Sequence, residues 1–194
     1  MSVPAEHRAV PPERTVHPAE RRADRVADAS LLTAAAAGSL LSVLRIAVGE
    51  FGSPFTPAYP FFLLWGAVPA FLILGAYLLT AASERGCGIR QQRGALAALT
   101  GLAVLSVPLI GFDNAFSPIY GLALMALALR TRGTLAAAAG VLAVSVSLTL
   151  ALAGETFTGL QATAAVFLVA VASGIAAVRC RREAAAAELG EGQP

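Results

Sequence analysis

Residues 112–121 read FDNAFSPIYG, a polar interruption between two long apolar runs. Half of this stretch recurs at 55–59 as FTPAY, again just ahead of an apolar run. In both copies a hydroxyl residue precedes proline, an order that favours a helix start. The hydroxyl can accept a hydrogen bond from a backbone N–H of the first turn, and proline has no backbone N–H that would be left without a partner there. Another apolar run opens with FTGLQ at 157–161, where Thr158 and Gln161 have the spacing of a capping box. The three stretches predict the starts of three helices on one side of the protein.

The composition is that of a membrane protein. Of the 194 residues, 57% are hydrophobic and 13% are charged, and the mean hydropathy is +0.71. An ordinary soluble domain carries about 25% charged residues. The charges are also unevenly placed, because residues 1–30 hold ten of the 26 acidic and basic side chains. Long windows without charge remain for helices that cross a bilayer.

Six apolar segments predict an all-α, polytopic transmembrane bundle of six helices arranged as three hairpins. They cover about 31–49, 60–82, 94–112, 115–129, 134–153 and 159–178. A helix needs about 20 residues to cross a hydrocarbon core of about 30 Å, so five segments are long enough and 115–129 is short. Two interpretations of 115–129 stay open. Either Arg130 and Arg132 snorkel to the head groups and extend the span, or the segment is a re-entrant or tilted piece inside the bundle.

The arginines predict the orientation. All fourteen basic residues are arginine, and thirteen of them lie in the tails or in the loops of one side. The alternate loops, 50–59, 113–114 and 154–158, contain none. By the positive-inside rule the arginine side is the cytoplasm, so both termini are expected there. The predicted location is the cytoplasmic membrane of a bacterium, with multiple spans.

The charged ends of the chain are predicted to lie outside this membrane domain, which covers 30–182. Residues 1–29 carry mixed charge and a proline every seven residues up to Pro18, which favours a disordered cytoplasmic tail. From Pro18 onward the prolines stop, and a surface helix starting there is the alternative. Residues 183–194 are predicted as a second disordered tail.

The predicted outer loops share a second pattern, a glycine followed by an acid. Glycine suits the end of one helix, and an acid near the next start meets a favourable helix dipole. Their uncompensated charge also favours an outer binding face that draws a cation, an amine or a proton. The candidate solute-binding residues are Arg45, Glu50, Asp113, Glu155, Tyr59 and Tyr120. The alternative is that capping alone explains the acids.

Arg45 is the exception to the arginine pattern, because it falls inside the first apolar segment, near its outer end. A charge within a span is a functional candidate, with one of the outer acids as its partner. Snorkelling of its long side chain to the outer interface is the structural alternative.

Small residues four apart predict close helix packing at four places. The pairs are Gly38 and Ser42, Ala97 and Gly101, Ala136 and Gly140, and Ala170 and Gly174. Elsewhere, Ser145 and Thr149 share one face of a helix, where they either line a polar path or bond back to their own helix.

The sequence gives little support to catalysis, to metal binding or to a cofactor. His7 and His17 both lie in the N-terminal tail, and no acid falls within the interior of a predicted span. Cys87 and Cys180 are expected to face the cytoplasm as reduced thiols and to lack the neighbours of a zinc site. The arginines form no stripe with interleaved aromatic residues, which argues against nucleic acid as a partner.

Three hypotheses for function follow. The leading one is a small membrane subunit that binds or passes a small polar or cationic solute; in size and topology the predicted bundle resembles small six-helix substrate-binding subunits of vitamin and metal uptake systems. The second is a non-catalytic interaction or assembly protein whose cytoplasmic arginines contact a partner subunit. The third is a membrane enzyme acting on a lipid or an isoprenoid. In all three hypotheses we expect the lipid bilayer to surround the protein.

Overall fold

Every element that the computed structural model describes is an α-helix. The described residues are 18–50, 59–87, 93–105, 118–153 and 158–191. The helices are α1 (Pro18–Glu50), α2 (Tyr59–Cys87), α3 (Arg93–Leu105), α5 (Ile119–Thr131), α6 (Thr134–Ala153) and α7 (Gly159–Glu191). The prediction of an all-α fold is confirmed.

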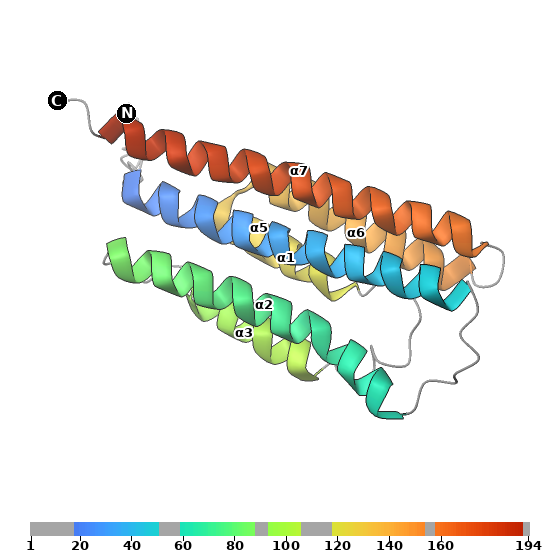
Figure 1. Ribbon diagram of the computed structural model, residues 1–194. Helices are drawn as coiled ribbons and strands as arrows, with labels where there is room; N and C mark the ends of the chain where they lie inside the picture. Colours follow the sequence, from blue (N-terminus) through green and yellow to red (C-terminus); the bar gives the residue numbers. More distant parts are fainter. Residues whose placement is uncertain (1–17, 51–58, 88–92, 106–117, 154–157, 192–194) are drawn as a thin grey trace, which may run out of the picture.

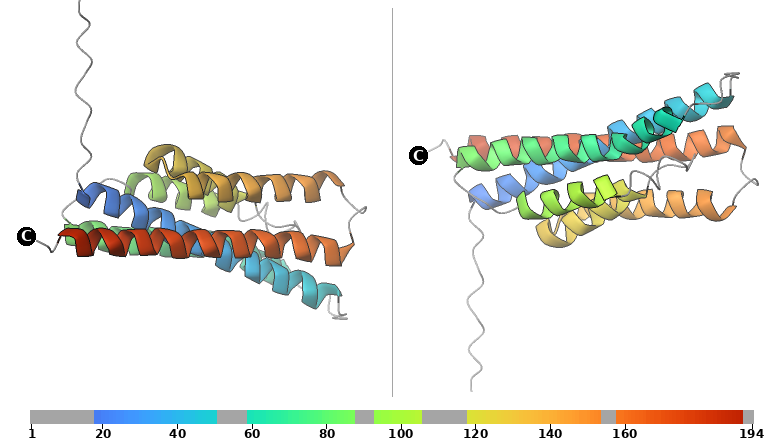
Figure 2. Two further views of the ribbon diagram at one scale, coloured as in Figure 1. Left: turned by 90° about the horizontal axis from the view of Figure 1, so that it is seen from above. Right: turned by 90° about the horizontal axis from the view of Figure 1, so that it is seen from below.

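The helices form two layers of three (Figures 1 and 2). α1 lies between α2 and α7 in one layer, and α3, α5 and α6 make up the other. α1 contacts helices of both layers, since it packs on α2, α7, α5 and α6. The start of α1 and the end of α7 lie side by side at one end of the bundle, and the turn between α5 and α6 lies in the same half (Figures 1 and 2).

Four helices are long and apolar enough to cross a membrane, through the stretches Glu20–Ala47, Gly66–Gly86, Thr134–Leu152 and Gly159–Ala186. α3 and α5 have 13 residues each, which is about 20 Å of helix against a hydrocarbon core of about 30 Å. Large apolar side chains lie exposed on the outside of the bundle, among them Phe71, Leu129 and Leu152, which are 66%, 86% and 79% exposed. An apolar surface of this extent suits lipid and not water, so the chain has the features of a membrane-embedded protein.

The interior is built mainly from small residues. Most of the buried apolar side chains are alanines, with Leu31, Ile73 and Leu124 among the larger ones. Helices approach closely where both present small residues. α5 and α6 approach each other closely, because a Cβ added to Gly121 would lie 2.9 Å from the carbonyl oxygen of Gly140, and a Cβ on Gly140 would lie 2.9 Å from that of Gly121.

The capping box predicted at the start of α7 is confirmed. The backbone N–H of Thr158 donates to Oε1 of Gln161 over 3.1 Å, and the N–H of Gln161 donates to Oγ1 of Thr158 over 3.4 Å. α5 starts differently, because its N-cap residue is Pro118 and no side chain caps it. The cap predicted from Ser117 lies outside the described residues.

The first and last helices are longer than the spans predicted for them. α1 starts at Pro18, as the alternative for this segment expects, and takes in 18–29; α7 continues through 183–191. Both additions belong to segments that the sequence predicts as disordered tails. They are rich in alanine, glutamate and arginine, which are good helix formers, and they lie side by side in antiparallel directions (Figure 1). Pairing gives each of them a surface on which to fold.

Candidate functional site

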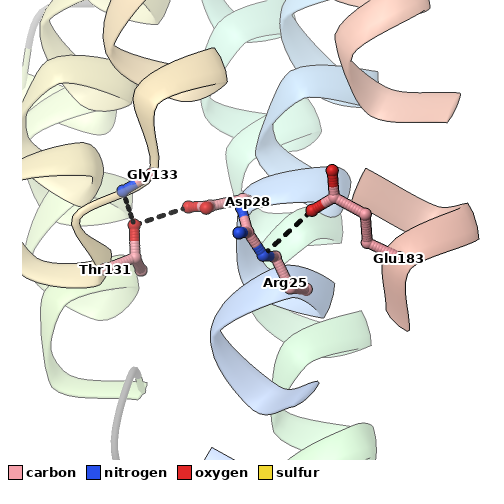
Figure 3. A network of polar contacts seen from close by, with 5 residues as sticks. All are labelled: Arg25, Asp28, Thr131, Gly133 and Glu183. Atoms are coloured by element: carbon pink, nitrogen blue, oxygen red, sulfur yellow. Dashed lines mark hydrogen bonds and ion pairs between the residues drawn. The ribbon is translucent and has the colours of Figure 1, made fainter. Parts of the chain in front are cut away.

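A network of polar contacts lies at the end of the bundle where α1 begins (Figure 3). We call it the Asp28 cluster, and it consists of Arg25, Asp28, Thr131, Gly133 and Glu183. Asp28 is at its centre and is only 1% exposed. Burying a carboxylate costs free energy unless other groups bond to it. The contacts around Asp28 therefore determine whether this end of the bundle is stable.

Thr131 supplies the direct hydrogen bond to Asp28. Its hydroxyl lies 2.9 Å from Oδ1 of Asp28, the acceptor to which it donates, and 3.2 Å from the carbonyl oxygen of Leu127. The same hydroxyl accepts from the N–H of Gly133 over 3.3 Å. Because Thr131 is the last residue of α5 and Asp28 belongs to α1, this bond joins the α5–α6 turn to the first helix.

The α5–α6 turn is shaped to bring its backbone against Asp28. Arg132 takes the left-handed conformation at φ 54° and ends α5, so that α6 can begin two residues later, at Thr134. A Cβ on the intervening Gly133 would collide with Oδ2 of Asp28. Glycine at 133 is therefore what allows the carboxylate and the turn to meet.

Two further contacts tie α7 to α1 at this end. Nε of Arg25 lies 3.2 Å from Oε2 of Glu183, with side chains that are 40% and 49% exposed. An ion pair so open to solvent contributes about 0–1 kcal/mol. Arg181 donates from Nη2 to Oγ1 of Thr33 over 3.1 Å. The free thiol of Cys180 is buried between these contacts, whereas the side chain of Cys87 lies outside the described residues.

On the other side of α1, hydroxyl groups connect it to α2. The hydroxyl oxygens of Ser30 and Thr80 lie 3.1 Å apart, and both residues are buried. Glu84, one turn further along α2, is fully buried as well. The expectation that no acid lies within a helix interior was wrong for Asp28 and Glu84, because α1 and α2 extend beyond the apolar segments that defined the predicted spans.

A signal for Asp28 exists in the sequence. Small or apolar residues recur at Ala23, Ala27, Leu31 and Ala35, one face of a helix, and Asp28 adjoins that face. The charges around it concealed the pattern, because they made 1–29 look like a solvated tail.

The outer binding face predicted from the sequence falls largely outside the described residues. Asp113 and Glu155 belong to undescribed segments, and the structure describes only the backbone of Glu50 and Tyr59, at the end of α1 and the start of α2. Arg45 is half-buried on α1. Whether Arg45 and the three acids meet in one place stays a prediction.

Tyr120 is the predicted site residue that the structure places most clearly, and it does not line an open surface. It is 1% exposed, and its phenol lies so close to Gly38 of α1 that a Cβ there would collide with the ring. From Gly38 to the end of α1 at Glu50 is 12 residues, or about 18 Å of helix. The expectation that FSPIY starts its helix at the outer face, level with FTPAY, was therefore wrong: α5 begins about halfway along the bundle.

The remaining sequence candidates have ordinary roles. Thr149 donates to the carbonyl oxygen of Ser145 over 2.8 Å, so this hydroxyl bonds back to its own helix. Within the described ranges, no group of three or more histidine, cysteine or acidic side chains is placed to hold a metal ion. Comparisons with models of protein families, with curated proteins and with solved structures find no match to this chain.

The Thr131 hydroxyl can be tested as a structural tie. Thr131→Val keeps the shape of the side chain and removes its hydrogen bond, so we expect a loss of about 1.5–3 kcal/mol in the free energy of unfolding, the range for bonds to charged groups. Asp28→Asn keeps an acceptor for Thr131 and should cost less. Thermal unfolding in detergent, followed by the fluorescence of the single tryptophan, measures both.

Thr149→Val is the matched control, because its hydroxyl bonds to its own helix on an exposed face; a change within about 0.5 kcal/mol is expected. Equal losses for Thr131→Val and Thr149→Val would contradict the assigned role of the Asp28 cluster.

Proposed function

We propose that the chain is a six-span protein of the cytoplasmic membrane with both termini in the cytoplasm. In this topology α3 and α5 contribute to the third and fourth spans, and the end of the bundle that holds the Asp28 cluster faces inward. Support comes from the arginines, because Arg132 in the α5–α6 turn and Arg182 near the end of α7 belong to that end, as the positive-inside rule requires.

A labelling experiment tests the topology. Ser53→Cys and Thr156→Cys place thiols in two predicted outer loops, and Arg90→Cys places one in a predicted inner loop. We expect a membrane-impermeant maleimide to label the first two from outside intact cells and the third only after permeabilisation. Labelling of Arg90→Cys in intact cells would overturn the proposed orientation.

For its activity we propose that the protein binds and passes a small polar or cationic solute. The observation that carries this proposal is the start of α5 halfway along the bundle, with Tyr120 buried against Gly38. Short helices that begin at mid-depth among full-length ones are typical of transporter folds, whose solute sites lie where such helices start. The backbone N–H groups there are satisfied by neighbours or by a bound solute and not by lipid.

The charges on either side of this position suit a cation. Glu50, Asp113 and Glu155 belong to the proposed outer face, together with Arg45 and Tyr59, and unbalanced acids raise the local concentration of cations. Asp28 lies beyond Tyr120, towards the proposed inner face, and adds a further carboxylate on that side. Neutral and cationic polar solutes are therefore favoured over anions.

Binding by the purified full chain tests the activity. The probes are sodium, magnesium, cobalt and nickel ions and a series of primary and quaternary amines, measured by calorimetry and by thermal stabilisation in detergent. We expect at least one class to bind, and Glu50→Gln, Asp113→Asn and Glu155→Gln combined to weaken that binding at least tenfold. Glu20→Gln, Glu188→Gln and Glu191→Gln combined remove three acids near the other ends of α1 and α7 and serve as the control, which should bind as wild type does.

Two results would remove this proposal. One is that no probe binds, and the other is that the triple variant binds as tightly as wild type. In either case the second candidate, an interaction or assembly protein, gains support from α1 and α7. Each has 33 residues, about 50 Å of helix, so the pair projects well beyond a core of about 30 Å and presents charged residues to a partner subunit.

A further inference from the structure

A hollow on the outer surface of α7 has the composition of a lipid site. It has a volume of about 440 Å³ and is lined by Val171, Gly174, Ile175, Val178, Arg179 and Arg182. Val171, Ile175 and Val178 are 40%, 54% and 50% exposed. The hollow thus has an apolar wall and, towards the end of the chain, two arginines.

Gly174 forms part of the wall of the hollow. A Cβ at this position would meet no atom within 4 Å, so the glycine is not needed for any contact inside the bundle among the described residues. The opposite face of α7 carries the side chains that pack on the bundle, such as Val169, Ala176 and Cys180, all of them buried. No described part of the chain fills the space at Gly174, which leaves room for a separate molecule.

The two arginines are placed to receive an anion. Arg181 points the other way, towards Thr33 of α1, and Arg25 is paired with Glu183. Arg179 and Arg182 are exposed, and within the described ranges neither makes a hydrogen bond or an ion pair. Two cations next to each other repel unless an anion lies between them.

We propose that this hollow binds one anionic phospholipid of the cytoplasmic leaflet. Its phosphate would contact Arg179 and Arg182, and one acyl chain would lie against Val171, Gly174 and Ile175. The dimensions agree, because Val171 to Arg182 is 11 residues, about 16 Å along the helix, and one leaflet of a core of about 30 Å is about 15 Å deep. Basic pockets at the cytoplasmic side of membrane helices bind acidic head groups in this way.

A second copy of the chain fits the same surface poorly. Copies in one membrane are related by a rotation axis along the bilayer normal, so a twofold contact through this face would bring the arginines of one copy against those of the other. Repulsion between the arginines of the two copies would oppose association. A phospholipid supplies the missing negative charge and the apolar filling together.

The test uses the full-length chain in detergent with phosphatidylglycerol or phosphatidylcholine added, and native mass spectrometry to count bound lipids. We expect one phosphatidylglycerol to bind in preference to phosphatidylcholine. Arg179→Gln with Arg182→Gln should weaken that binding roughly thirtyfold, the effect of two basic residues near a membrane surface. Arg85→Gln with Arg132→Gln removes the same charge from other exposed sites and should leave the binding within about twofold.

Gly174→Leu tests the apolar part separately. The new side chain projects into the hollow from a Cβ that meets no atom within 4 Å, so the variant should fold and should bind phosphatidylglycerol at least tenfold more weakly. The proposal is overturned if the Arg85 and Arg132 variant loses as much binding as the Arg179 and Arg182 variant, or if Gly174→Leu binds as wild type does. A concentration-dependent dimer that Gly174→Leu abolishes would assign the hollow to a second copy instead.

Discussion

Gly140→Leu is expected to separate α5 from α6 and to destabilise the bundle strongly, as is the same exchange at its contact partner Gly121. A Cβ on Gly140 would lie 2.9 Å from the carbonyl oxygen of Gly121 and 3.0 Å from the backbone nitrogen of Met125. These are backbone atoms, so no change of rotamer relieves the overlap and the whole helix must move. Overpacking costs 1–3 kcal/mol where side chains can adjust, and we expect about 3 kcal/mol or more at this contact.

Thermal unfolding measures this effect. For a chain of this length 1 kcal/mol corresponds to about 2–4 °C, so Gly140→Leu should lower the Tm by roughly 6–12 °C or prevent folding. The controls are Gly75→Ala in α2 and Gly101→Ala in α3, where a Cβ meets nothing within 4 Å. Alanine favours a helix over glycine by about 0.5–1 kcal/mol, so both controls should equal or exceed wild type. A Gly140→Leu protein with the wild-type Tm would mean that α5 and α6 are not in backbone contact.

Gly38→Leu should also destabilise the protein, because it drives a side chain into the phenol of Tyr120. The ring has no room to withdraw, since Tyr120 is 1% exposed. We expect a cost of about 2–3 kcal/mol. Tyr120→Ala should also destabilise by about 3–5 kcal/mol, because it leaves a cavity where the ring was.

The two exchanges together distinguish this contact from general damage. Leucine at 38 occupies part of the space that alanine at 120 vacates, so the double variant should be about 1–2 kcal/mol more stable than the sum of the single effects predicts. In the control, which combines Gly101→Leu with Tyr120→Ala, the loss of stability should equal the sum of the two single losses. If the stability losses of Gly38→Leu and Tyr120→Ala were additive, the two residues would not be in contact, and the start of α5 would then not be at mid-depth.

The glycines illustrate what the sequence predicts and where it stops. Spacing of small residues marks Gly38, Gly101, Gly140 and Gly174 alike as packing positions. The structure uses Gly38 and Gly140 for close contacts and leaves Gly101 and Gly174 facing open space. Small residues permit a close approach on any face of an alanine-rich helix, and the choice of face depends on partner helices that local spacing does not identify.

Helix ends are predictable where one local rule applies. The bounds of α6 and the capping box of α7 follow from residues within one turn of each end. The depth at which α5 starts is determined by the helices that pack on it, because a Ser-Pro helix start is compatible with any depth in the membrane. Asp28 escapes prediction for a related reason: its surroundings in sequence are polar, and its burial results from Thr131, which lies 103 residues away in the chain.

The antiparallel pairing of α1 with α7 also governs when the protein can finish folding. Among the described helices α1 leaves the ribosome well before α7, with about 140 residues of synthesis between them. At 5–20 residues per second, roughly 10–30 s pass before α1 meets the helix that covers one of its sides. During that time the face of α1 that packs on α7 lacks its final neighbours in the membrane. The bundle is therefore completed only once α7 has been made, and a product shortened before α7 retains an uncovered α1 that quality-control proteases can recognise.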